Sequence, residues 1–172
     1  MSEKVLFGLF DKNASIEKRL IKEIKKTSYR NLYIENFETF ESKNELIVFS
    51  GVVLNRNELN EFAGIKTESD AELIHYLFSK ENYQGFKRIN GKFLIIIQTK
   101  TSTIVARDRY GQGPMFYYNN ECFTNLFWQL QSFKNIYFEP EITALGNYLM
   151  YSYIPSPLTA FKNIKKLAGE RY

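Results

Sequence analysis

Cys122 is the only cysteine in the 172-residue chain, and His75 is the only histidine. A cysteine nucleophile needs an adjacent base, because a free thiol is only a few per cent ionised at pH 7. Cys122 lies beside Phe123 in a segment with strand character, so we interpret it as a small buried apolar residue. One cysteine and one histidine also exclude an internal disulfide, a cysteine-cluster metal site and a two-histidine zinc motif.

Two other groups of polar residues, Arg107–Arg109 and Asp70, stand where they can stabilise the local backbone. The triplet Arg107-Asp108-Arg109 follows a predicted strand and precedes Gly111. A carboxylate here can accept hydrogen bonds from loop N–H groups or pair with an arginine, and either interaction fixes the loop. Asp70 stands in the first turn of a predicted helix, where a carboxylate interacts with the helix dipole by about 0.3–1 kcal/mol. The residues alone therefore favour structural roles for both groups.

Hydrophobic periodicity predicts the elements that position these residues. Ser69 with Glu72 three residues later is typical of a capping box at a helix start. Strands are expected at 5–10, 32–40, 46–53, 92–98, 103–108, 115–118 and 122–125, and helices at 15–26, 57–62, from 69 onward and at 142–151. Hairpins with helices between and after them indicate an α+β fold with largely antiparallel sheets.

Composition narrows the class of protein further. Hydrophobic residues make up 44% of the chain, which excludes disorder as the main state, and 172 residues are enough for one domain. No apolar run approaches the ~18–20 residues of a membrane span, and the polar N-terminus is too short for a signal peptide. The net charge is only +4, and acidic residues interrupt the basic cluster at 18–26. We therefore expect a cytoplasmic protein that binds neither nucleic acid nor membrane.

Five motifs in one order resemble a known family. They are Thr67-x-Ser69-Asp70-x-Glu72, Asn90-Gly91-Lys92-Phe93, the stretch 106–111, the stretch 114–118 and the stretch 154–169. Together they resemble the N-terminal glutaminase-type domain of asparagine synthetases, a class II glutamine amidotransferase. This resemblance implies the N-terminal-nucleophile hydrolase fold, a four-layer α/β/β/α sandwich of two antiparallel sheets. It also implies a single domain over 1–172, in which 152–172 lead out toward an ATP-pyrophosphatase domain.

The resemblance implies glutamine hydrolysis, but the cysteine nucleophile of the family is missing from this sequence. In active members an N-terminal cysteine attacks the glutamine side-chain amide, and its own α-amine is the base. Here Lys4 occupies that position, and three residues precede it. Ser2 can become N-terminal if Met1 is removed, but it lies about 6–7 Å along a strand from the family position. We therefore expect no catalytic residue on this chain.

The glutamine pocket of the family is only partly retained. Its Asn-Gly-Glu turn is matched by Ser50-Gly51-Val52, so Gly51 is kept while the oxyanion-hole asparagine is replaced by serine. Asp70 matches the aspartate that binds the glutamine ammonium group in the family. We call Ser50, Gly51 and Asp70 the relic pocket.

The resemblance and the losses together predict a scaffold. The chain has no ATP-binding loop, so ATP and Mg are expected on a synthetase domain in cis or in trans, and no cofactor is expected here. β-Lactam synthetases and lasso-peptide macrolactam synthetases resemble asparagine synthetases but need no ammonia, so a parent of this type is expected. The Arg107–Arg109 loop would face that partner. The aromatic residues Tyr148, Tyr151, Tyr153 and Phe161 would either anchor the same interface or pack in the core. The alternative is a stand-alone protein that binds a metabolite or a partner through the relic pocket.

Overall fold

The computed structural model describes residues 5–9, 25–26, 32–119, 121–132 and 136–169. The chain forms two compact units, one from residues 1–36 and 114–168 and the other from residues 37–113 and 169–172. Each unit is built on its own antiparallel sheet. The α+β class with two antiparallel sheets is therefore confirmed, whereas the order of the four layers stays a prediction.

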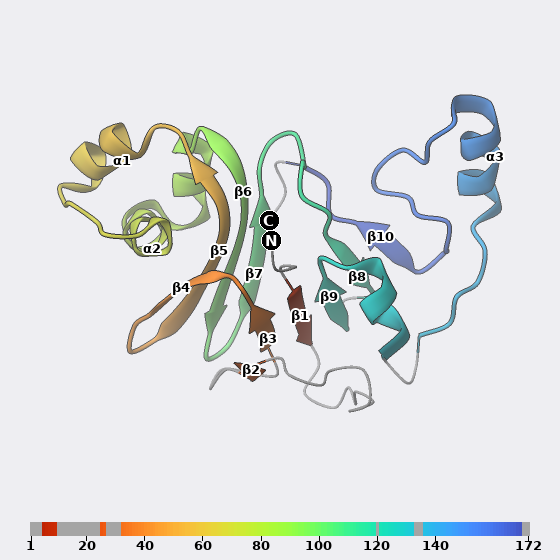
Figure 1. The fold of residues 1–172 in the computed structure, drawn as a ribbon, viewed down its shortest axis with the longest axis horizontal. Helices are drawn as coiled ribbons and strands as arrows, with labels where there is room; N and C mark the ends of the chain where they lie inside the picture. The colour runs from red at the N-terminus through yellow and green to blue at the C-terminus, as the bar shows by residue number, and fades with distance from the viewer. Residues whose placement is uncertain (1–4, 10–24, 27–31, 120, 133–135, 170–172) are drawn as a thin grey trace. The chain divides into compact units, whose positions relative to one another are not determined.

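The unit at 37–113 holds a four-stranded sheet (Figure 1). Its strands are, in spatial order, β4 (Glu38–Glu41), β5 (Glu45–Val53), β6 (Gly91–Thr99) and β7 (Thr103–Arg107). The register of β5 and β6 places Gly51 opposite Phe93. This pairing extends over nine residues of each strand, so it fixes the position of the Ser50–Val53 segment.

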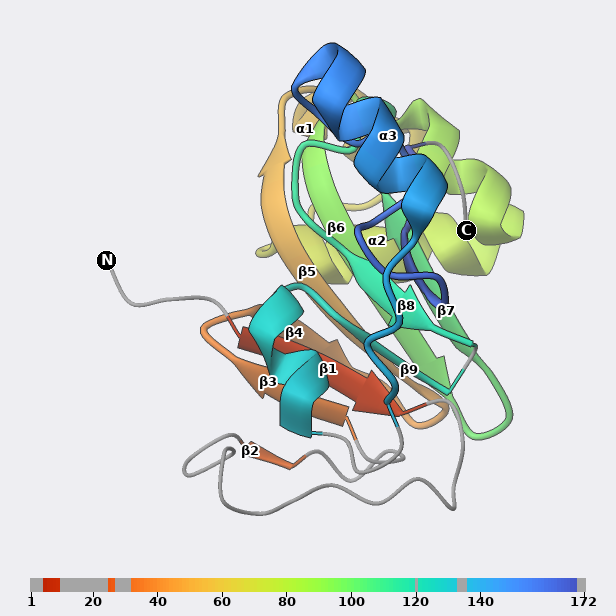
Figure 2. The same cartoon turned by 90° about the vertical axis from the view of Figure 1, so that its right-hand side faces the viewer.

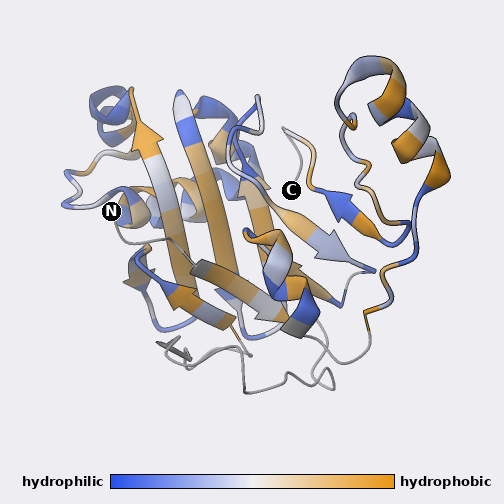
Figure 3. Ribbon diagram, turned by 45° about the vertical axis from the view of Figure 1, so that its right-hand side comes forward, coloured by the Kyte–Doolittle hydropathy of each residue, from blue (hydrophilic) through white to orange (hydrophobic). Residues whose placement is uncertain are grey.

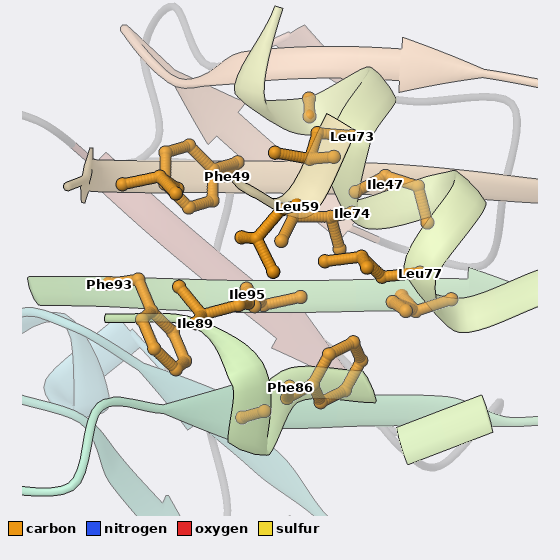
Figure 4. Packing of buried hydrophobic residues seen from close by; sticks show 14 residues of the cluster. Ile47, Phe49, Leu59, Leu73, Ile74, Leu77, Phe86, Ile89, Phe93 and Ile95 are labelled. Atoms are coloured by element: carbon orange, nitrogen blue, oxygen red, sulfur yellow. The ribbon is translucent and has the colours of Figure 1, made fainter. Parts of the chain in front are cut away.

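Helices α1 (Arg56–Ala63) and α2 (Asp70–Glu81) and the 3₁₀ segment η1 (Asn82–Arg88) pack on one face of this sheet (Figures 1 and 4). Leu73, Ile74 and Leu77 of α2 are fully buried against apolar strand residues. Each such burial contributes roughly 1.5–3 kcal/mol. The helical spacing of these residues thus turns one face of α2 toward the sheet.

The predicted start of α2 is confirmed in detail. Ser69 Oγ accepts a hydrogen bond from the Glu72 N–H at 3.1 Å, as an N-cap does. The Glu72 carboxylate accepts from the Glu68 N–H at 2.9 Å rather than from the cap residue itself. Asp70 is consequently the first helical residue, with its carboxylate in the first turn.

The other unit holds a six-stranded sheet (Figure 2). Its strands are, in spatial order, β10 (Ile164–Lys166), β8 (Phe116–Tyr118), β9 (Cys122–Thr124), β1 (Val5–Leu9), β3 (Leu32–Glu35) and β2 (Lys25–Lys26). Its core includes Phe7, Tyr118 and Cys122, and the 3₁₀ segment η2 (Phe127–Ser132) contributes Leu130. Phe161 joins this core, stacked on Phe127 at a centroid distance of 5.7 Å.

Helix α3 (Ile142–Tyr151) lies apart from the strands of its unit (Figures 1 and 2). Ala144 is its only buried residue. Much of this helix is coloured as hydrophobic in Figure 3, and apolar side chains on and just after it are exposed. The exposed set comprises Ile142, Leu145, Tyr148, Leu149, Met150, Tyr151 and Tyr153, and we call it the α3 face.

Two expected elements need correction. The single strand predicted at 32–40 is wrong, because Asn36 has a φ of 60° and separates β3 from β4, which belong to different sheets. Most of the helix predicted at 15–26 lies outside the described residues, and its end is wrong because Lys25–Lys26 form β2. The segment predicted as a lead-out contains β10, which pairs with β8, and its role toward a second domain stays a prediction. No described helix is both long and apolar enough to cross a membrane.

Candidate functional site

Asp70 lies next to the end of β5, whereas Ser50 and Gly51 lie further back along that strand. The Asp70 carboxylate accepts a hydrogen bond from the Val53 N–H, two residues beyond Gly51. Its Oδ1 atom lies 3.5 Å from Arg56 Nη1 and has no hydrogen bond within the described part of the chain. Arg56 is held in turn by a 3.1 Å hydrogen bond from Nη2 to the Thr67 carbonyl. The aspartate that the resemblance assigns to a ligand ammonium therefore faces a cation of its own chain.

The environment of Asp70 disfavours its charged form. Burial raises the pKa of the Asp70 carboxyl above its ordinary value, and the nearby Glu38 carboxylate adds to this effect. Arg56 and the Val53 N–H act in the opposite direction on that pKa. Glu38 is held there because its Oε1 accepts a 2.9 Å hydrogen bond from the Ala71 N–H at the start of α2. Two carboxylates thus share one helix terminus, and the expected benefit of Asp70 to the helix dipole is outweighed by its burial.

We expect Asp70→Asn to raise the free energy of unfolding at pH 7 by less than about 1 kcal/mol. The folded-state pKa of Asp70 is raised, so the native state binds more protons than the unfolded state, and stability falls as pH rises through this range. The advantage of Asn is thus present at pH 7 and is lost as pH falls below the ordinary value of 3.8. Urea unfolding between pH 7 and pH 3.5 measures this difference.

The exposed first-turn carboxylate of α1, Glu58, serves as the control for that experiment. Glu58→Gln removes a charge that is favourable at a helix start, so it is expected to lower stability slightly. A loss of more than 1 kcal/mol in Asp70→Asn at pH 7 would show instead that the Asp70 charge stabilises the fold.

Gly51 has a structural reason to be glycine. Its φ is 151°, and a Cβ built on it would lie 2.0 Å from the Lys92 carbonyl oxygen on β6. The close approach of β5 and β6 therefore demands a residue without a side chain at this point. Ser50 precedes it in β5, opposite Leu94, and is half-buried. The pairing of Gly51 with Phe93 thus holds β5 against β6 two residues before Val53, the β5 residue that interacts with Asp70.

The Arg107–Arg109 loop is fixed as the residue types predicted. Asp108 is buried, and its carboxylate accepts hydrogen bonds from the N–H groups of Tyr110 at 3.0 Å and Gln112 at 3.3 Å. Burial lowers the pKa of Arg107, and the neighbouring Asp108 opposes that shift. The structural interpretation of the loop is thus confirmed, and its contact with a partner domain stays a prediction.

Cys122 is not available as a nucleophile. It is 1% exposed in β9, and burial raises the pKa of its thiol to about 12. A thiol with this pKa is almost wholly protonated at neutral pH. The interpretation of Cys122 as a buried apolar residue is therefore confirmed. Lys4 and Ser2, which concern the family's nucleophile position, lie outside the described residues.

Sequence reasoning missed Arg56 and Glu38 as parts of this site. Neither stands in a motif, and each reaches Asp70 or its helix only through the tertiary fold.

In the part of the chain that the structure covers, no group of three or more His, Cys, Asp or Glu side chains is placed to hold a metal ion.

Comparison with known proteins identifies the family. The sequence model of the family described as glutamine amidotransferase domain matches residues 38–172 of this chain. A putative asparagine synthetase (glutamine-hydrolyzing) 2 from Methanocaldococcus jannaschii is 31% identical over 135 residues, which are 73% of this chain and 26% of that protein. Asparagine synthetase (glutamine-hydrolyzing) 1 from Bacillus subtilis is 26% identical over 75% of this chain and 22% of its own length. The chain thus spans about a quarter of these relatives or less.

A carboxyethyl-arginine beta-lactam-synthase from Streptomyces clavuligerus is 32% identical over 71 residues, covering 40% of this chain and 14% of that protein. Among solved structures, the glutamine phosphoribosylpyrophosphate amidotransferase from B. subtilis covers 76% of the chain at a TM-score of 0.48 and 14% identity. This chain belongs to the glutamine amidotransferase domain family, as a domain of the asparagine synthetase type.

Proposed function

We propose that this chain is the structural module of an asparagine-synthetase-type, ATP-dependent amide-forming enzyme, and that it does not hydrolyse glutamine. It would work in the cytoplasm and dock on a synthetase domain, in cis or in trans, which would bind ATP and Mg. The α3 face carries this proposal, because its apolar side chains are exposed among the residues that the structure describes.

The α3 face has the composition of a protein–protein contact. Leu149 is 84% exposed, Met150 73% and Ile142 71%. Soluble monomers rarely leave large contiguous apolar patches in water, and such patches mark interaction sites. Three exposed tyrosines, Tyr148, Tyr151 and Tyr153, lie on or just after the same helix, and tyrosine is enriched among interface residues that contribute most to affinity. Phe161 instead packs against the core of its unit, so it is not part of the proposed interface.

The relic pocket supports the loss of glutaminase chemistry. The Asp70 carboxylate already faces Arg56, and Cys122 is buried in the other unit. A parent that takes its amine from its own substrate needs no ammonia. The similarity to the Streptomyces beta-lactam-synthase supports such a parent, and natural-product amide formation, including lasso-peptide macrolactam formation, is the class we propose.

The alternative is a stand-alone protein that binds a metabolite through the relic pocket. A ligand ammonium would have to compete with Arg56 for Asp70, since Arg56 Nη1 already lies 3.5 Å from its carboxylate. The α3 face also has no role in that alternative. We therefore place it second.

The proposal is tested by the affinity of this chain for the asparagine-synthetase-type ATP-using domain of the same organism. That domain is expressed separately, and binding is measured by sedimentation velocity and calorimetry. Leu149→Ser with Met150→Ser is expected to weaken binding at least tenfold, because buried interface residues often contribute more than 1 kcal/mol each.

The matched control is Leu54→Ser with Tyr137→Ser, which removes two apolar side chains that are 71% and 76% exposed outside the α3 face. This control is expected to change the affinity less than twofold. Equal losses in both pairs of variants, or no association of the unmodified chains, would refute the docking role.

A further inference from the structure

A cavity of about 270 Å³ lies within the unit at 37–113, and none of the relic pocket residues lines it, although its lining residue Phe93 pairs with Gly51. It is formed by the end of η1, the start of β6 and the loop that follows β7. Ser50, Gly51 and Asp70 do not line it. The cavity is therefore a second candidate site, built from different elements.

Positive charge dominates the lining. Lys87, Arg88, Arg107 and Arg109 all line the cavity, and among the residues that the structure describes no Asp or Glu belongs to the lining. Arg88 is paired outside it with Glu81, through two hydrogen bonds of 2.7 Å. Lys87 and Arg109 are exposed residues of the lining. The lining thus presents cations to whatever enters.

Arg107 is held rigidly at this site. It is only 7% exposed, and its guanidinium packs against Gly111, where a Cβ would lie 2.6 Å from Nη2. The φ of 60° at Gly111 and the hydrogen bonds to the Asp108 carboxylate hold the loop in that position. A preorganised guanidinium in a partly desolvated site is suited to planar, two-pronged recognition of carboxylate or phosphate oxygens.

The remaining walls limit the ligand's size and character. Phe86, Ile89 and Phe93 provide apolar surface, and Tyr110, which is 79% exposed, lies at the edge toward solvent. The volume is slightly below the ~300–1,000 Å³ typical of drug-sized ligands. A small carbon frame with one or two anionic groups fits both the walls and the volume.

We propose that this cavity binds a small organic anion, a carboxylate or a phosphate ester, through Arg107, Arg109 and Lys87. The site is independent of the docking role of the α3 face, so either proposal can fail without the other.

The test is titration of the full chain with inorganic phosphate and with citrate at constant ionic strength, followed by calorimetry and thermal shift. Saturable binding of either probe is expected, and the tighter one identifies the anionic group. Lys87→Ser with Arg109→Ser, and separately Arg107→Gln, are each expected to weaken binding at least tenfold.

The control is Lys43→Ser with Lys66→Ser, which removes two exposed cations outside the cavity and is expected to change the affinity less than twofold. If Arg107→Gln does not fold, the double variant of exposed residues decides the question. The proposal is overturned if neither probe binds, if the cavity variants bind as the unmodified chain does, or if the control pair loses as much affinity.

Discussion

Glutamine incubated with this domain is expected to release no ammonia above the uncatalysed rate. The only cysteine, Cys122, is buried, and its thiol has a pKa of about 12, so it supplies no thiolate at neutral pH. Serine replaces the family's oxyanion-hole asparagine at position 50, and loss of one such donor typically costs 10²–10³ in rate. Loss of the nucleophile removes the covalent route altogether. A coupled glutamate dehydrogenase assay measures the released ammonia.

Two controls make that negative result informative. Asparagine synthetase (glutamine-hydrolyzing) 1 from B. subtilis, assayed in parallel, shows that the assay detects a glutaminase. Cys122 is expected to resist a maleimide in the native protein and to react fully after unfolding in urea. Steady ammonia release that disappears in a Ser2→Ala variant would contradict the prediction and would identify Ser2 as the nucleophile.

Gly51→Ala is expected to lower the free energy of unfolding by about 2–5 kcal/mol. The φ of 151° is strained for a residue with a side chain, and the new Cβ would lie 2.0 Å from the Lys92 carbonyl oxygen and 2.8 Å from Phe93 Cα. These are backbone atoms, so β5 and β6 would have to separate where Gly51 faces Phe93. The expected decrease in the melting temperature is roughly 5–15 °C, measured by calorimetry.

Gly113→Ala is the matched control in the same unit. No atom lies within 4 Å of the Cβ it would introduce, and its backbone is not in the left-handed region. It is expected to change stability by less than about 0.5 kcal/mol. Equal stability of the two variants would contradict the close pairing described for β5 and β6. A large difference would show that strand pairing requires Gly51 whether or not the domain hydrolyses glutamine.

Local signals in the sequence predicted most elements correctly. The Ser69 cap and the apolar spacing of Leu73, Ile74 and Leu77 define α2, because these interactions lie within one or two turns of the chain. The prediction at 32–40 was wrong because a run of strand-forming residues does not show which sheet each part joins. The αL conformation of Asn36 makes that division.

The candidate site was predicted only in part. Asp70 and Gly51 were found through the family's motifs, and the loop-fixing role of Asp108 followed from its residue type. Arg56 carried no signal, because its contact with Asp70 depends on how the segment between α1 and α2 folds back. The charged groups that surround Asp70 could therefore not be predicted from the sequence.

The amino-acid sequence alone was sufficient to identify the family, the order of most helices and strands, and the absence of a cysteine at the family's nucleophile position. These properties depend on residue identity and on contacts between near neighbours. Which side chains are buried and which charged groups come into contact is visible only in the folded chain, since both depend on residues far apart in the sequence. Burial of Cys122, the pairing of Asp70 with Arg56, exposure of the α3 face and the cationic cavity around Arg107 all arise at that level.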